Sequence, residues 1–146
     1  MSMMTLTGNR IIDCALLSWF LAQLCKVVLD LILERKFTVS RFVSSGGMPS
    51  SHSALVVSCT TAIAKTSGIA SPLFALSVVF SAVVMYDACN VRRSAGDTAK
   101  IVNKLLQHVE KMTAQEVADD LKIIMGHTPL QVVVGAVLGL IVGLIW

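Results

Sequence analysis

Four apolar segments dominate this chain and restrict the architectures that are open to it. They cover about residues 11–33, 53–67, 72–91 and 129–146, and the last segment contains no charged residue. Such a stretch is typical of a membrane-spanning helix, which needs ~20 mainly apolar residues to cross the hydrocarbon core. Because 55% of the residues are hydrophobic, we expect an all-α integral membrane protein.

The segments predict one membrane domain over residues 1–146, built as a helical bundle of about four spans. The segment 53–67 is short, since at ~1.5 Å per residue it covers roughly 22 Å of a hydrocarbon core of ~30 Å. A re-entrant second segment, leaving three spans, is the alternative. We interpret the first segment as a retained span rather than a signal peptide, because no small-residue cleavage site ends it.

A polar stretch of different character separates the third and fourth segments. Apolar residues recur at helical spacing within 101–109 and again within 117–124. Asp97 is a candidate N-cap for the first of these helical patterns, and "TAQE" at 113–116 has capping-box spacing before the second. The pattern predicts an amphipathic helical insertion over about 97–125, at the membrane surface or over a site.

Basic residues are distributed unequally between the two faces of a four-span chain. The opposite face carries only Arg10 and Lys65, while Lys26 lies within a span. The loop before the second segment and the stretch between the third and fourth carry the other nine: Arg35, Lys36, Arg41, Arg92, Arg93, Lys100, Lys104, Lys111 and Lys122. The positive-inside rule therefore predicts that this richer face is cytoplasmic and that both termini lie outside.

The stretch "SGGMPSSHS" at 45–53 has the composition of an anion-binding turn. A helix that begins near Ser50 or Ser51 directs N–H groups and the positive end of its dipole toward the preceding loop. Gly47 belongs to a glycine pair that gives this loop backbone freedom. His52, in the first turn, has the chemistry to protonate a leaving oxygen. A capped helix start whose histidine faces interfacial water is the structural alternative.

Two further groups are predicted on the same membrane face as His52. Arg92 follows the third segment and His127 precedes the fourth. Arginine binds phosphate in bidentate geometry, although a single arginine here is equally compatible with a cytoplasmic anchor. For a single histidine, a polar interfacial residue is the favoured interpretation. Their convergence with His52 favours one shared phosphate site.

The stretches "SGGMPSSHSA", "VVMYDACNVRR" and "GHTPLQVVVGAVLG" occur in this order. They resemble the divergent membrane branch of the type 2 phosphatidic acid phosphatase superfamily, to which the vanadium haloperoxidases are also related. The resemblance covers nearly the whole chain. It implies an acid-phosphatase-like hydrolase whose substrate is a phosphorylated lipid, such as a phosphatidate-like or prenyl phosphate.

The resemblance also implies residue roles. The third-motif histidine of the superfamily attacks phosphorus and forms a phosphohistidine, and the second-motif histidine protonates the departing alkoxide. These roles fall to His127 and His52, with Gln131 in the position that supports the nucleophile. The implied phosphate-binding residues are Gly47, Ser50, Ser51, Arg92, Arg41 and Lys26.

The chain departs from the superfamily pattern in each of its three motifs. Ser51 stands where the second motif has glycine, and Gln131 stands where the third motif has aspartate. The amide oxygen of Gln131 can accept the Nδ1–H hydrogen bond of the nucleophile, but it lacks the negative charge. The basic first motif has no exact match, and Lys26 and Arg41 are its nearest counterparts.

Two of these assignments leave alternatives open. Asp87 could supply the missing carboxylate, or it could pair with Arg92 or Lys26. Lys26 itself could pair with Asp30 four residues along the helix, or extend toward the membrane surface.

The sequence thus predicts a membrane phosphatase, with a non-catalytic lipid-phosphate binder or scaffold as the alternative. We expect lipid phosphate and membrane lipid as partners, and neither a metal nor another cofactor. A net charge of +3 does not argue for nucleic acid. Gly135, Gly139 and Gly143 form overlapping GxxxG units that favour close helix packing, either within the chain or in a homodimer.

Overall fold

A computed structural model describes residues 5–34, 47–91, 98, 101–102 and 127–146. Over these residues the chain is all-helical and contains no strand, which confirms the predicted fold class. The elements are α1 (Arg10–Glu34), α2 (Ser51–Ser67), α3 (Pro72–Tyr86), η2 (Asp87–Val91) and α6 (Pro129–Ile145).

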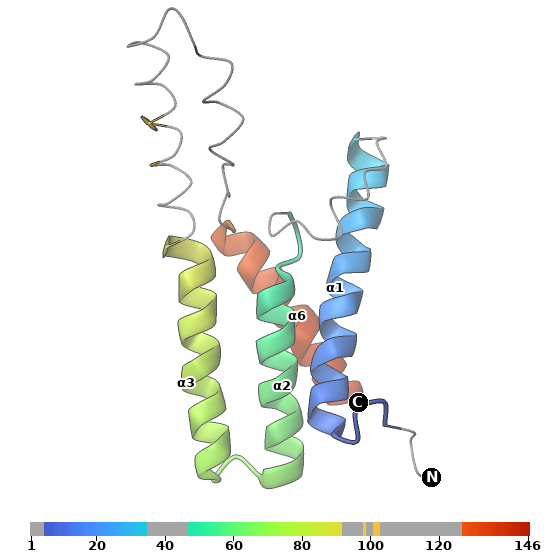
Figure 1. Cartoon of the computed structure of the whole chain (residues 1–146), viewed down its shortest axis with the longest axis vertical. Helices are drawn as coiled ribbons and strands as arrows, with labels where there is room; N and C mark the ends of the chain where they lie inside the picture. The colour runs from blue at the N-terminus through green and yellow to red at the C-terminus, as the bar shows by residue number, and fades with distance from the viewer. Residues whose placement is uncertain (1–4, 35–46, 92–97, 99–100, 103–126) are drawn as a thin grey trace, which may run out of the picture.

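The short helix α2 lies at the centre of the bundle. It contacts α1, α3 and α6, and α6 crosses behind it (Figure 1). This position explains why α2 is more polar than its neighbours, since its hydroxyl side chains are buried against other helices. Ser51, Ser53, Ser58 and Thr61 are all buried.

Hydroxyl groups connect α2 to its neighbours through hydrogen bonds that cross between helices. The Ser18 hydroxyl of α1 donates to the Ala54 carbonyl at 3.0 Å, and the Ser81 hydroxyl of α3 donates to the Val56 carbonyl at 3.2 Å. The hydroxyls of Thr60 and Ser81 also lie 2.8 Å apart. Because polar groups in an apolar surrounding must find internal partners, these bonds fix α1 and α3 against α2.

The glycine stripe of α6 faces α2 of the same chain. A β-carbon at Gly135 would collide with the Ser50 carbonyl, one at Gly139 with the Ala54 carbonyl, and one at Gly143 with the Thr61 side chain. Of the two packing arrangements that the sequence allowed, the structure therefore has the one within the chain. A homodimer remains a prediction, and it would need a different surface.

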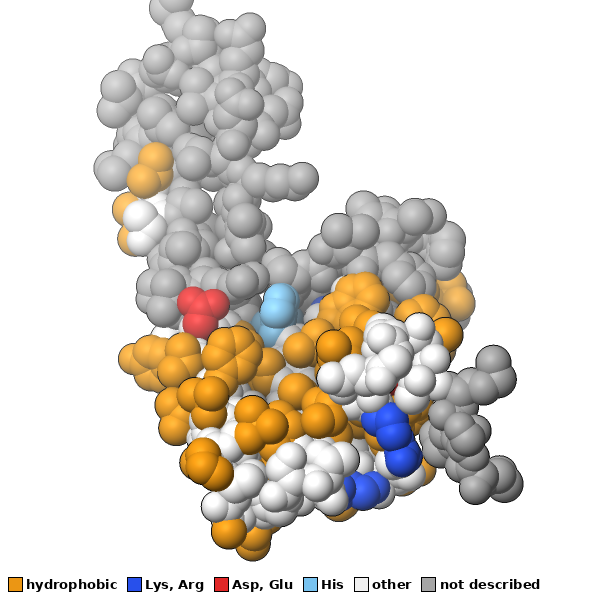
Figure 2. Space-filling model, turned by 60° about the horizontal axis from the view of Figure 1, so that its bottom comes forward, with side chains coloured by type: hydrophobic (Ala, Val, Ile, Leu, Met, Phe, Trp, Pro, Cys, Tyr) orange, Lys and Arg blue, Asp and Glu red, His pale blue; other side chains and the backbone are white. Residues whose placement is uncertain are grey.

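The outer faces of α1, α3 and α6 are apolar. Large hydrophobic side chains stand exposed along them, such as Leu76, Val79 and Phe80 of α3, each more than 60% exposed. Figure 2 shows hydrophobic side chains spread over the outer surface of the described helices. The segments Arg10–Ile32 and Pro72–Asn90 are long and apolar enough to cross a membrane, and Pro129–Ile145 is a shorter apolar helix. The number of spans and their orientation remain predictions.

The third predicted segment differs from the structure near its end. The α-helical turns of α3 end at Tyr86, and the chain continues through Asp87–Val91 as a π-helical turn. Such wider turns occur often at functional sites. The predicted insertion over 97–125 lies outside the described residues, except for positions 98, 101 and 102, which are helical.

Gly139→Ala is expected to destabilise the protein by about 1–3 kcal/mol, because the added methyl group overlaps the Ala54 backbone. Helix propensity alone predicts the opposite effect, since alanine favours a helix over glycine by ~1 kcal/mol. A loss of stability would therefore report the close packing of the two helices. Thermal unfolding of the purified protein in detergent measures the effect. Ile141→Phe, which enlarges a side chain that is 48% exposed on the same helix, serves as the control and should leave stability nearly unchanged. An unchanged or raised Tm for Gly139→Ala would contradict the packing.

Candidate functional site

Two backbone hydrogen bonds bring together three stretches that are distant in the sequence. The Ser50 N–H donates to the Gln131 carbonyl at 3.0 Å, which joins the start of α2 to the first turn of α6. The His127 N–H donates to the Ala88 carbonyl at 3.0 Å, which joins the approach to α6 to η2. The three motifs therefore meet at one end of the bundle, as the sequence predicts.

A serine cap fixes the first turn of α2. Ser50 is the N-cap, and its hydroxyl accepts from the Ser53 N–H at 3.4 Å and from the Ser53 hydroxyl at 3.1 Å. Gly47 precedes it with a φ of 94°, a conformation that favours glycine. Ser50, Ser51 and Ser53 are all buried. This local structure holds the positive end of the α2 dipole in place at the site.

Lys26 reaches the same helix start from α1. Its side chain is only 3% exposed, and Nζ donates a hydrogen bond of 3.2 Å to the Ser51 hydroxyl. A β-carbon on Gly47 would lie 3.8 Å from the Lys26 Cδ, so the loop packs on the lysine stem. Lys26 therefore points into the protein instead of extending toward the membrane surface. It adds positive charge beside the first turn of α2.

The two histidines of the predicted site lie next to each other. The ring centroids of His52 and His127 are 6.2 Å apart, and the ring planes make an angle of 61°. His127 is 2% exposed, whereas His52 is half-buried. The structure thus brings one buried and one accessible imidazole to the start of α2.

Gln131 contacts the His127 ring and also caps the start of α6. Its Oε1 lies 3.3 Å from the His127 Nδ1 and accepts from the Thr128 N–H at 3.0 Å. The Thr128 hydroxyl in turn accepts from the Gln131 N–H at 3.4 Å, which completes a capping box at the start of α6. Thr128 was not among the predicted site residues, although the spacing of "TPLQ" at 128–131 matches the capping-box motif.

Asp87 lies near His52. It lines a cavity of about 410 Å³ together with His52, Val83, Val84 and Ala88. Asp87 belongs to the π-helical turn η2, which follows α3 directly. This position favours a role for Asp87 near His52 rather than as a replacement for the aspartate of the third motif.

Two predicted phosphate ligands, Arg41 and Arg92, lie outside the described residues. Their part in the site remains a prediction. Among the residues that are described, no three His, Cys, Asp or Glu side chains are grouped so that they could hold a metal ion.

The contact with Gln131 predicts the tautomer of neutral His127. Because an amide oxygen accepts but does not donate, the His127 ring should carry its proton on Nδ1. ¹⁵N NMR of histidine-labelled protein distinguishes the two tautomers, and Gln131→Leu should remove the preference. Leu130→Ala, at a neighbouring exposed position, should leave the spectrum of His127 unchanged. A dominant Nε2–H tautomer in the parent protein would contradict this geometry.

Comparisons with known proteins identify the family of the chain. The model of the Divergent PAP2 family matches residues 7–142. The chain is 36% identical, over 152 residues, to "Uncharacterized membrane protein YuiD" of Bacillus subtilis (strain 168), and the match covers 97% of this chain and 96% of the relative. No solved structure matches the chain. The relative is described as a membrane protein, in accord with the apolar helices found here. The chain belongs to the Divergent PAP2 family.

Proposed function

We propose that this protein is a membrane phosphatase that hydrolyses a phosphorylated lipid through a phosphohistidine intermediate. The observation that carries the proposal is the pair of imidazoles, His52 and His127, with centroids 6.2 Å apart at the start of α2. Membership of a phosphatase-related family supports the same reaction class.

The start of α2 offers a seat for the phosphate group. A phosphate monoester carries about −1.5 to −2 charges at neutral pH. The N–H groups and dipole of the first α2 turn favour an anion, and the buried Lys26 side chain adds a cationic hydrogen-bond donor beside them. These groups would also stabilise the charge on the phosphoryl oxygens as the bond to the leaving group breaks.

In the first step, the His127 Nε2 attacks phosphorus and the bond from phosphorus to the lipid oxygen breaks. With the proton held on Nδ1 by Gln131, Nε2 carries the lone pair that this attack requires. His52, in its protonated form, donates a proton to the departing alkoxide. The lipid alcohol leaves, and the phosphoryl group stays on His127.

In the second step, water attacks the phosphohistidine. His52, now neutral, accepts a proton from that water while the N–P bond breaks, and inorganic phosphate leaves. His52 is the more accessible of the two histidines and faces the cavity shared with Asp87. Both water and leaving group can reach it from that side, and the Asp87 carboxylate would favour its protonated form.

An apolar groove supports a lipid as the substrate rather than a soluble phosphate ester. The groove has a volume of about 640 Å³ and runs between α3, η2 and α6, and its lining side chains include Met85, Cys89, Val132 and Ala136. Val132 follows Gln131 directly in the chain, and Cys89 follows Ala88, whose carbonyl binds His127. A hydrocarbon chain in this groove would place its headgroup near the histidines.

Gln131 also favours a second candidate, a lipid-phosphate binder without turnover. An amide orients His127 but cannot stabilise the positive charge that develops on the ring, and loss of a triad carboxylate elsewhere costs up to ~10⁴ in rate. The binder would retain the anion seat at α2 and the apolar groove. Saturable vanadate binding without any release of phosphate from lipid esters would favour this candidate.

Replacement of either histidine is expected to abolish phosphate release. The purified full-length protein is assayed on a panel of phosphatidate and prenyl phosphates, and rapid quenching traps a phosphohistidine. His127→Ala should lower kcat by at least about 10³-fold and remove the trapped intermediate, because it removes the nucleophile. His52→Ala should slow turnover by about 10²–10⁴-fold, because it removes the proton donor.

His108→Ala is the matched control, since it replaces the third histidine of the chain. Its activity should equal that of the parent protein. Equal activity of His127→Ala and the parent would refute the assigned nucleophile, whereas an inactive parent that binds vanadate would favour the binder.

Filling the apolar groove should change substrate preference. Ala136→Phe places an aromatic ring in the groove and should raise KM for a long-chain lipid phosphate by about tenfold, because it displaces the methylene groups that bind there at ~0.8 kcal/mol each. Hydrolysis of a short-chain phosphate ester should change little. Ile141→Phe, on the same helix but outside the groove lining, is the control. An equal loss on both substrates would contradict a chain-binding role for the groove.

A further inference from the structure

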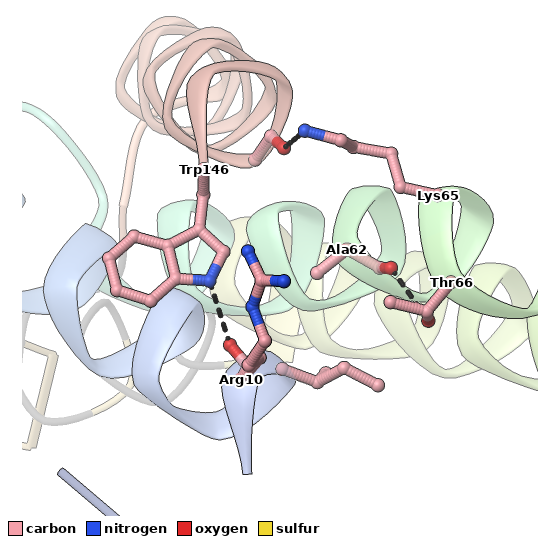
Figure 3. Close-up of a pocket in the computed structure, with 7 residues that line it drawn as sticks. Arg10, Ala62, Lys65, Thr66 and Trp146 are labelled. Atoms are coloured by element: carbon pink, nitrogen blue, oxygen red, sulfur yellow. Dashed lines mark hydrogen bonds between the residues drawn. The ribbon is translucent and has the colours of Figure 1, made fainter. Parts of the chain in front are cut away.

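The end of the bundle opposite the histidines contains a second polar pocket. His52 lies in the first turn of α2, whereas Lys65 lies in its last turn. There the start of α1 and the C-terminal ends of α2 and α6 enclose a pocket of about 170 Å³ (Figure 3). We call it the terminal pocket. It is lined by Arg10, Ile11, Ala62, Lys65, Thr66, Gly143 and Trp146.

Two cations meet in the terminal pocket. Three Lys and Arg side chains lie within the described ranges, and Arg10 and Lys65 are two of them. Figure 2, which turns this end of the molecule forward, shows blue side chains close together among uncharged atoms. In the predicted four-span topology, the same two residues are the only Lys and Arg residues on this face of the membrane.

No described aspartate or glutamate side chain pairs with these cations. Asp13 lies one turn along α1 from Arg10, but its carboxylate is buried and accepts from the Leu6 N–H at 2.8 Å, the Thr7 N–H at 3.1 Å and the Thr7 hydroxyl at 2.8 Å. Neither Arg10 nor Lys65 forms an ion pair within the part of the chain that the structure describes. The cationic side chains of the terminal pocket are therefore not matched by an acidic side chain within the described ranges.

The hydrogen bonds around the terminal pocket leave donors available. Trp146 Nε1 donates to the backbone carbonyl of Arg10 at 3.0 Å, so this contact does not use the guanidinium. Figure 3 shows the guanidinium projecting from α1 into the space between the Trp146 indole and α2. Lys65 Nζ donates to the carbonyl of Leu144 at 2.8 Å and to that of Gly143 at 3.4 Å, which occupies two of its three N–H groups.

The surroundings of the terminal pocket are those of a membrane interface. Exposed apolar side chains stand beside it, including Ile12 at 47%, Leu144 at 59% and Ile145 at 81% exposed. Tryptophan favours the level of the lipid headgroups, and arginine and lysine at helix ends favour the same level. A ligand held here would have a charged end in the pocket and an apolar part along α1 and α6.

We propose that the terminal pocket binds the phosphate group of an anionic phospholipid from the leaflet at this end of the bundle. Arg10 would hold two phosphate oxygens in bidentate geometry, and Lys65 would contribute its remaining N–H. The acyl chains would lie along the exposed apolar side chains of α1 and α6. This site lies at the opposite end of α2 from the histidines and involves no chemical change in the lipid.

Quenching of Trp146 fluorescence by brominated lipid tests the proposal. The chain has two tryptophans, and Trp19→Phe leaves Trp146 as the single reporter. The full-length variant is reconstituted in phosphatidylcholine with increasing fractions of brominated phosphatidylglycerol or, separately, brominated phosphatidylcholine. Phosphatidylglycerol is a phosphodiester, so the result does not depend on hydrolysis of phosphate monoesters at the histidines.

The expected result is that brominated phosphatidylglycerol binds at least about fivefold more tightly than phosphatidylcholine, as a charge-assisted contact allows. Arg10→Gln should reduce this ratio to about one, whereas Arg10→Lys should retain most of it. Equal quenching by the two lipids in the parent protein would overturn the proposal. So would an unchanged ratio in Arg10→Gln, with thermal unfolding used to show that this variant is folded.

Inorganic phosphate distinguishes a lipid from a free anion. An excess of phosphate is expected to leave the phosphatidylglycerol preference in place, relative to sodium chloride at the same ionic strength, which accounts for screening. Loss of the preference in phosphate alone would assign the terminal pocket to free phosphate and overturn the lipid assignment.

Discussion

The close approach of α6 to α2 is the constraint on which the site depends. Gly135 and Gly139 have no side chains, so the backbones of the two helices touch at Ser50 and Ala54. Only at this separation can the Ser50 N–H reach the Gln131 carbonyl, as it does at 3.0 Å. Small residues drive helix association in membranes through close packing, and here the same packing aligns the first turns of two helices at one site.

A polar site inside an apolar bundle requires that each polar group find a partner within the protein. The structure meets this requirement by enclosing its most hydroxyl-rich helix, α2, with three more apolar helices. Hydroxyls of the neighbouring helices then donate to backbone carbonyls of α2, as Ser18 of α1 and Ser81 of α3 do. The groups at the start of α2 are held in the same way, which leaves the Lys26 ammonium group directed at the Ser51 hydroxyl.

Hydropathy alone predicted the described helices to within a few residues. A long apolar segment in a membrane must satisfy its backbone hydrogen bonds internally, and a helix does so. Hydropathy did not predict the π-helical turn at Asp87, which depends on local packing. The sequence also did not determine whether the Lys26 side chain points into the protein or toward the membrane surface, because its direction depends on how α1 is rotated against α2. For Gly139 it predicted close packing but not the partner, because a small-residue stripe is the same whether the second helix belongs to the same chain or to another copy.

The proposed site depends most directly on the proximity of the two imidazoles, whose centroids lie 6.2 Å apart. Solid-state NMR of the protein in lipid bilayers, with ¹³C-labelled histidine rings, measures this proximity through ring-to-ring correlations. We expect a correlation between His52 and His127 that disappears in His52→Gln. Its absence from the parent protein, under conditions where both rings give assigned signals, would contradict the shared site.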